Sequence, residues 1–136
     1  DFQANNFFVE ANNVWLFDFD GCCYANYLYD VASFILSCFL GGFGGGKECS
    51  QVIEEILHYL KIGYELNHKC TDEYWEQLPL FISYRAAYTA LMLAEIETCG
   101  VVSSLDEIKE FFSFILLQDD IYEGITKVIS EGKSRL

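Results

Sequence analysis

Two short apolar runs near the start of the chain have the composition of β-strands. They cover Phe7–Glu10 and Val14–Phe19, and the residues Ala11-Asn12-Asn13 separate them. Asn readily takes the left-handed backbone conformation that a tight turn needs. The pattern therefore predicts a short antiparallel hairpin, with asparagine supplying the left-handed turn residue.

Beyond the hairpin, apolar residues recur at helical spacing. Ser104-Leu105-Asp106-Glu107 has the pattern of a capping box, and Thr71 is the predicted N-cap of a shorter helix. The longer predicted helices cover Ala25–Leu40, Glu48–Leu66, Leu78–Cys99 and a stretch from Ser104 that is broken or bent near Asp119-Asp120.

The glycine-rich segment 41–46 is predicted to be a loop. Together with Lys47 it fits the spacing of a phosphate-binding loop, but Glu48 replaces the required Ser or Thr, and the segment follows a helix where such loops follow a strand. It is not a nucleotide site. We expect one domain over residues 1–136, mainly α with a small antiparallel β-hairpin and about five helices.

The composition and net charge of the chain limit the kinds of ligand that it can bind. Of 136 residues, 52% are hydrophobic and 17% aromatic, which is enough for one sizeable core. The net charge of -13, with only eight Lys and Arg, excludes a nucleic-acid backbone as the ligand and favours cationic or amine substrates.

Six cysteines show no recurring C-x-x-C spacing, so neither a zinc site nor a disulfide framework is predicted. We expect reduced thiols packed as small hydrophobes in a cytoplasmic protein. The apolar stretch from Tyr27 to Gly46 is interrupted by Asp30 and is too short to cross a bilayer, so no membrane association is expected.

The first six residues and the end of the second predicted strand have the residue types of phosphoryl-transfer chemistry. Such chemistry needs a carboxylate to accept the substrate hydroxyl proton, and an amide oxygen with a second carboxylate to hold magnesium. Asp1, Asn6 and Asp18 match these three roles, and the hairpin between Asn6 and Asp18 would bring the metal ligands together. The alternative is a terminal carboxylate, a turn residue and a polar strand end.

Two further carboxylates need separate interpretation. Asp20 follows Asp18 by two residues, so it is either an auxiliary metal ligand or an exposed strand end. Asp30 lies within an apolar helix, where an ionised carboxylate must be paired or accept hydrogen bonds.

Three segments in this order resemble the aminoglycoside phosphotransferase/choline kinase superfamily, which has a protein-kinase-like fold. The segments are Asp1-Phe2-Gln3-Ala4-Asn5-Asn6, Val14-Trp15-Leu16-Phe17-Asp18-Phe19-Asp20 and Tyr27-Leu28-Tyr29-Asp30-Val31-Ala32. Further similarity at Lys61–Tyr64 and Leu78–Arg85 extends the resemblance over most of the chain. The His-Gly that precedes the catalytic aspartate in the family is missing before Asp1, and Gly21 stands where many relatives have a second acid.

The resemblance implies an ATP- and magnesium-dependent kinase that phosphorylates a hydroxyl of a small molecule, and the negative net charge favours a cationic one. Asp1 would be the catalytic base, Asn6 and Asp18 the metal ligands, and Asp30 the support that bonds the catalytic loop. This chain corresponds to the C-terminal lobe alone, since it has no glycine-rich strand turn and no strand lysine to hold ATP. We therefore expect the fragment to be inactive, to expose an apolar face where the other lobe would dock, and to be able to self-associate through it.

Two other functions fit the same sequence. The first is a non-catalytic kinase-like binding or scaffold domain that has kept the fold. The second is a helical interaction module in which the motif match is accidental. An aminoglycoside, choline, homoserine, a sugar and a protein hydroxyl all remain open as substrates.

Overall fold

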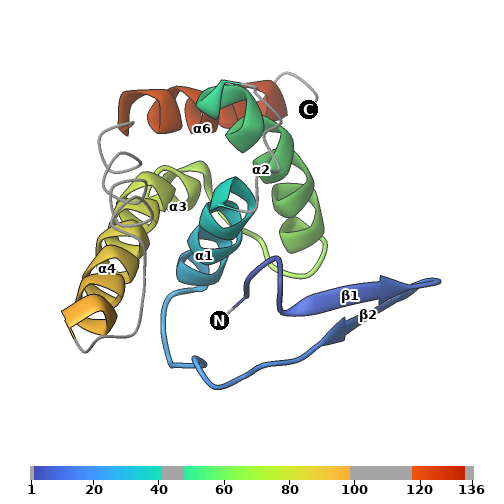
Figure 1. Ribbon diagram of the computed structural model, residues 1–136. Coiled ribbons are helices and arrows are strands. Elements are labelled where there is room, and N and C mark those ends of the chain that lie inside the picture. The colour runs from blue at the N-terminus through green and yellow to red at the C-terminus, as the bar shows by residue number, and fades with distance from the viewer. Residues whose placement is uncertain (1, 41–47, 99–117, 134–136) are drawn as a thin grey trace.

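The computed structural model of the protein describes residues 2–40, 48–98 and 118–133 (Figure 1). The hairpin strands are β1 (Phe7–Glu10) and β2 (Asn13–Leu16), and the helices are α1 (Tyr27–Leu40), α2 (Cys49–Glu65), α3 (Asp72–Trp75), α4 (Leu78–Thr98) and α6 (Gln118–Lys133). The predicted fold class, mainly α with a small antiparallel hairpin, is confirmed. The predicted helix start at Ser104 lies outside the described residues, and α6 begins at Gln118, just before the Asp119-Asp120 pair where a break or bend was predicted.

The hairpin has a two-residue turn, and its strands pair from Phe7 opposite Leu16 to Glu10 opposite Asn13. The left-handed turn residue is Ala11, with φ of 52°, and not an asparagine as predicted. Strand β2 also ends at Leu16, before the predicted end at Phe19. The reason is Asp18, whose φ of 59° turns the chain out of the extended conformation.

Helix α1 begins after a side-chain cap. The Asn26 Oδ1 atom accepts a hydrogen bond from the backbone N–H of Leu28 at 3.0 Å, so Asn26 occupies the N-cap position and the helix starts two residues later than predicted. Thr71 has the extended backbone of an N-cap residue before α3, but its hydroxyl makes no capping hydrogen bond.

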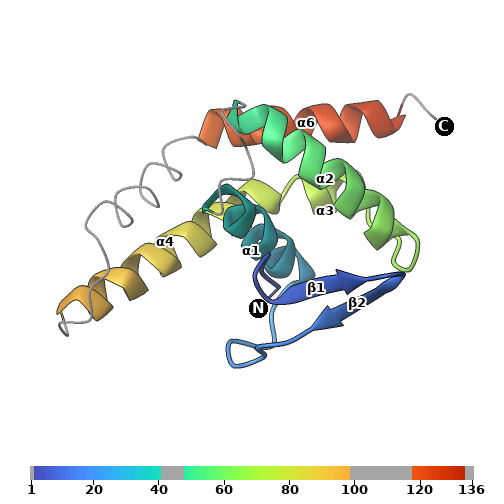
Figure 2. The same ribbon diagram turned by 45° about the vertical axis from the view of Figure 1, so that its right-hand side comes forward.

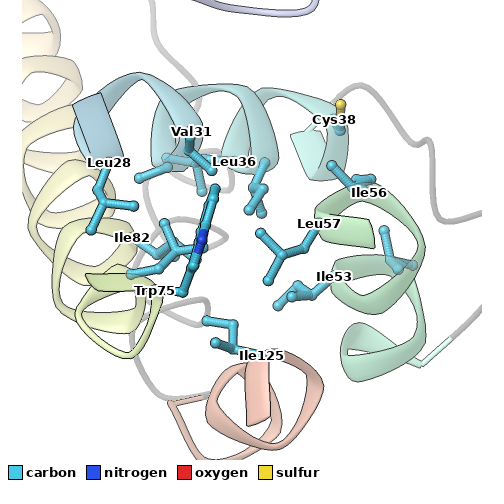
Figure 3. Close-up of a cluster of buried hydrophobic side chains, with 14 of the residues drawn as sticks. Leu28, Val31, Leu36, Cys38, Ile53, Ile56, Leu57, Trp75, Ile82 and Ile125 are labelled. Carbon is cyan, nitrogen blue, oxygen red and sulfur yellow. The ribbon is translucent and has the colours of Figure 1, made fainter. Parts of the chain in front are cut away.

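One apolar core joins the helices (Figure 3). Helix α2 packs on α6, α1 packs on α4, and Trp75 from the short helix α3 is fully buried at 0% exposure between them. The other fully buried large residues are Leu28, Val31, Ile35, Val52, Ile53, Leu57, Leu78, Ile82 and Ile125. Since burying each such side chain stabilises the fold by about 1.5–3 kcal/mol, this core determines the arrangement of the helices.

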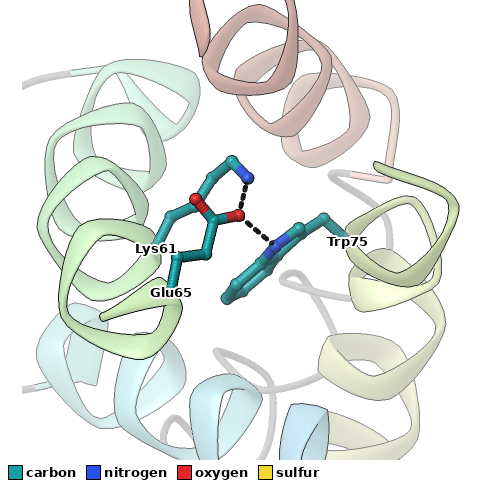
Figure 4. Close-up of polar contacts among 3 residues, drawn as sticks. All are labelled: Lys61, Glu65 and Trp75. Carbon is teal, nitrogen blue, oxygen red and sulfur yellow. Dashed lines mark hydrogen bonds and ion pairs between the residues drawn. The ribbon is translucent and has the colours of Figure 1, made fainter. Parts of the chain in front are cut away.

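The indole N–H of the buried Trp75 has a polar partner (Figure 4). It donates to the Glu65 Oε1 atom at 3.2 Å, and the Lys61 ammonium forms an ion pair with the same carboxylate oxygen. The Lys61 Nζ atom also lies 5.4 Å from the centroid of the indole ring. These contacts satisfy the polar edge of the indole and tie the end of α2 to α3.

The cysteines whose burial the structure describes differ in exposure, and Cys70 is half-buried. Cys38 is buried, and burial raises the pKa of its thiol, whereas Cys22 and Cys23 are exposed in the segment between β2 and α1. The prediction that all six pack as small hydrophobes is therefore wrong for these two. Among the helices that the structure describes, none has both the length and the apolar character needed to cross a membrane.

Two helical glycines differ in the space around them and provide a matched test of helix packing. A Cβ atom added at Gly124 of α6 would lie 2.8 Å from the backbone oxygen of Ser50 in α2, whereas one at Gly63 of α2 would meet nothing within 4 Å. Gly124→Ala should lower the free energy of unfolding by about 1–3 kcal/mol, because a backbone atom cannot move aside alone. Gly63→Ala should raise it by up to about 1 kcal/mol through helix propensity. Urea melts of both variants measure this, and an unchanged stability of Gly124→Ala would contradict the close α2–α6 approach.

Candidate functional site

Asn6 is fixed at the base of the hairpin. Its side chain is 9% exposed, its backbone N–H donates to the carbonyl of Gln3, and its own carbonyl accepts from the N–H of Phe17, both at 3.0 Å. Its Nδ2 atom donates to the backbone carbonyl of Asp18 at 3.3 Å. The hairpin therefore brings Asn6 to Asp18, twelve residues later in the chain.

Asp18 occupies the point where the chain leaves the hairpin. Its side chain is exposed and its backbone is left-handed, a conformation that costs most L-residues roughly 1–2 kcal/mol but that Asp and Asn tolerate better. Backbone conformations of this kind concentrate at functional sites. The bond from Asn6 holds the Asp18 carbonyl in this conformation.

The loop before β1 is tied to helix α1. The N–H of Phe2 donates to Asp30 Oδ1 at 3.4 Å, and the N–H of Ala4 donates to Ser37 Oγ at 2.8 Å. The ring of Phe2 stacks on Phe34 with centroids 4.9 Å apart. Asp30 is half-buried. The hydrogen bond that it accepts comes from the loop that the family resemblance predicts it to support. Asp1, the predicted catalytic base, lies outside the described residues.

A pocket of about 260 Å³ lies beside this junction. Half of its lining residues are aromatic, and its polar groups include one carboxylate and one carboxamide. The lining residues are Phe2, Asn6, Leu16, Phe17, Phe19, Cys22, Asp30 and Tyr64. Asp18 and Asp20 are both exposed, and neither is among the lining residues, although Asp18 lies between Phe17 and Phe19 in sequence.

Tyr64 is the polar lining residue that comes from a distant helix, and it was not predicted from the sequence as a site residue. It comes from the last turn of α2, and only the packing of α2 beside the hairpin base brings it to Asn6 and Asp30. Burial first, and then the negative charge of Asp30, raise the pKa of Tyr64 to about 12. The family resemblance at Lys61–Tyr64 does not assign Tyr64 a role, because its place in the site depends on a contact between distant elements.

The hairpin base offers few side chains that could bind a metal ion. Within residues 2–40, 48–98 and 118–133, no group of three or more His, Cys, Asp or Glu side chains is placed to hold a metal ion. Magnesium commonly uses one or two protein carboxylates and takes its remaining ligands from water and substrate phosphates. The Asp18 carboxylate and the Asn6 carboxamide fit that class of donor set in chemical type.

Comparisons of this chain with protein-family models, with curated proteins and with solved structures found no match.

Asp30 and Asp20 allow the loop anchor to be tested against a matched carboxylate. Asp30→Ala should lower the free energy of unfolding by about 1–3 kcal/mol, because the N–H of Phe2 loses its acceptor in a partly buried position. Asp20→Ala should change it by less than about 0.5 kcal/mol, since Asp20 is exposed. Thermal melts of the two variants measure the difference, and equal small losses would show that Asp30 does not hold the loop.

The pKa of Tyr64 predicts a pH effect on stability. Below pH 10 its phenol is protonated in both the folded and the unfolded chain, so it adds no pH dependence. Between its ordinary pKa of 10.0 and its folded pKa of about 12, the unfolded chain ionises first, so the free energy of unfolding should fall as pH rises through this window. Tyr64→Phe should make this alkaline decline shallower in urea melts at stepped pH. A decline of equal slope in both proteins would assign it to other groups.

Proposed function

We propose that this chain is the catalytic-loop and metal-binding lobe of an ATP- and Mg²⁺-dependent phosphotransferase. The reaction is transfer of the γ-phosphate to a hydroxyl group of a small molecule. The observation that carries the proposal is the junction of Asn6 with Asp18 at the base of the hairpin, beside a pocket and a loop anchored to Asp30.

The roles of the residues follow from the needs of phosphoryl transfer. Asp18 and Asn6 would hold Mg²⁺, which when bound supplies positive charge against the phosphate oxygens. Asp1 accepts the proton of the substrate hydroxyl. Asp30 does not touch the reacting atoms; it positions the loop through the N–H of Phe2. ATP would be held by a second lobe, as in the family that the sequence resembles.

The pocket supports a small, cationic substrate. Aromatic rings of Phe17, Phe19 and Tyr64 can attract a cation by their faces, and Asp30 adds a negative charge to the same lining. The net charge of -13 would draw such a substrate toward the protein. The free thiols of Cys22 and Cys23 support a reducing, cytoplasmic location.

Manganese binding tests the metal assignment without requiring catalysis. The chain should bind Mn²⁺, measured by the loss of its free-ion electron paramagnetic resonance signal, and Asp18→Asn and Asn6→Ala should each weaken binding by about tenfold or more. Asp20→Asn is the matched control and should change affinity by less than about twofold if Asp20 is no ligand.

Asp18→Gly separates metal binding from folding. Glycine adopts positive φ without strain, so this variant should be at least as stable as the parent chain in thermal melts while losing Mn²⁺ affinity. If all of these variants bind Mn²⁺ like the parent, the metal assignment fails and the kinase-like scaffold becomes the better explanation. Transfer itself is tested in the longest natural product of the gene, with labelled ATP, a panel of small hydroxyl compounds and Asp1→Asn as the inactive control.

A further inference from the structure

The hairpin exposes apolar side chains along most of its length. Figures 1 and 2 show that it extends away from the helical body. Near the body, Phe7 packs on Phe34 of α1, with ring centroids 5.8 Å apart. Six large apolar residues of the hairpin and its exit are between 44% and 63% exposed: Phe8, Val9, Val14, Trp15, Leu16 and Phe17.

Three of these side chains form a continuous aromatic surface. Phe8 lies opposite Trp15 in the strand register, and Phe17 follows Trp15 by two residues, which places it on the same face. The ring centroid of Phe8 lies 6.2 Å from that of Trp15 and 6.2 Å from that of Phe17. We call Phe8, Trp15 and Phe17 the aromatic stripe.

A two-stranded sheet is only weakly stabilised by the contacts between its own strands. Strands β1 and β2 pair only with each other among the described strands, so each has an outer edge without a partner strand in that set. An isolated two-stranded hairpin is marginally stable in water, and an exposed edge is a template for pairing with another chain. Large exposed apolar patches of this kind mark interaction sites.

The charges near the stripe indicate the chemistry of the partner. Glu10 at the end of β1 and Asp18 and Asp20 just after β2 are exposed carboxylates, and residues 2–40 contain no Lys, Arg or His. A second copy of this chain would therefore bring like charges to the contact, in addition to its own net charge of -13. Arginine suits this surface, because it pairs with carboxylates and stacks on aromatic faces.

We propose that the hairpin is a docking site for an extended, basic segment of a partner protein. The segment adds as a third strand along an outer edge of the hairpin, covers the aromatic stripe with alternate side chains, and places Arg or Lys beside Glu10. This inference does not depend on phosphotransfer, and it selects a basic partner over the self-association expected from the sequence.

A designed peptide tests the proposal with the chain as it exists. The probe is a blocked eight-residue peptide of alternating Arg and Val, compared with one of alternating Glu and Val and with an Arg-Val peptide carrying two central prolines. We expect the Arg-Val peptide to bind in calorimetry and to shift the fluorescence of Trp15, the exposed one of the two tryptophans. The Glu-Val and proline peptides should bind at least about tenfold more weakly, because one repels and the other cannot pair as a strand.

Variants locate the site. Phe8→Ser and Glu10→Lys should each weaken Arg-Val binding by about fivefold or more, while Tyr59→Ser, at a 71% exposed aromatic residue of α2, should leave it unchanged. Thermal melts of each variant confirm that it is folded. Equal loss at Tyr59, or no loss at Phe8 and Glu10, would mean general attraction to an acidic chain and would overturn the proposal. The proposal is also overturned if the Arg-Val peptide does not bind. It is overturned as well if the chain alone dimerises as its concentration rises, with a shift in Trp15 fluorescence that Phe8→Ser abolishes.

Discussion

The attachment of the loop at residues 2–6 to helix α1 is the contact on which the candidate site depends. Two backbone N–H groups, of Phe2 and Ala4, donate to side chains of α1, and the ring of Phe2 stacks on the same helix. Asn6 follows directly, and through it the position of Asp18 is set. Helix α1 in turn is held by the core around Trp75, so the geometry of the exposed site is determined by buried contacts some distance away.

The local elements were accessible from sequence because their signals are local. The apolar spacing from Leu28 to Leu36 predicted α1, and the two β-prone runs predicted the hairpin. The hairpin base does join Asn6 to Asp18, but through the Asp18 backbone carbonyl, so a metal shared by the two side chains stays a prediction. The errors arise where one residue's conformation is decided by its neighbours in space. Ala11 takes the left-handed turn position although asparagines follow it. The left-handed backbone of Asp18 makes β2 end at Leu16, three residues before the predicted end at Phe19.

The site is harder to predict than the fold, since its parts come from separate elements. Asp30 was identifiable because a carboxylate in an apolar helix needs partners, whereas Tyr64 carries no such conflict in its own segment. The exposure of Cys22 and Cys23 was missed for a related reason. The segment between β2 and α1 is apolar in composition, but none of the described helices covers these two cysteines. Composition predicts burial only where another surface is available to supply it.

The separation in sequence between the loop and its anchors has a consequence for synthesis on the ribosome. The acceptors of Phe2 and Ala4 lie 28 and 33 residues further along the chain. At typical elongation rates of 5–20 residues per second, these anchors are made about 1–7 s after the loop itself. During that interval the apolar hairpin has emerged without the helix that fixes its base. Chaperones that bind nascent chains could therefore bind the hairpin before α1 packs against its base. The rate at which they capture the hairpin should depend on how quickly α1 forms.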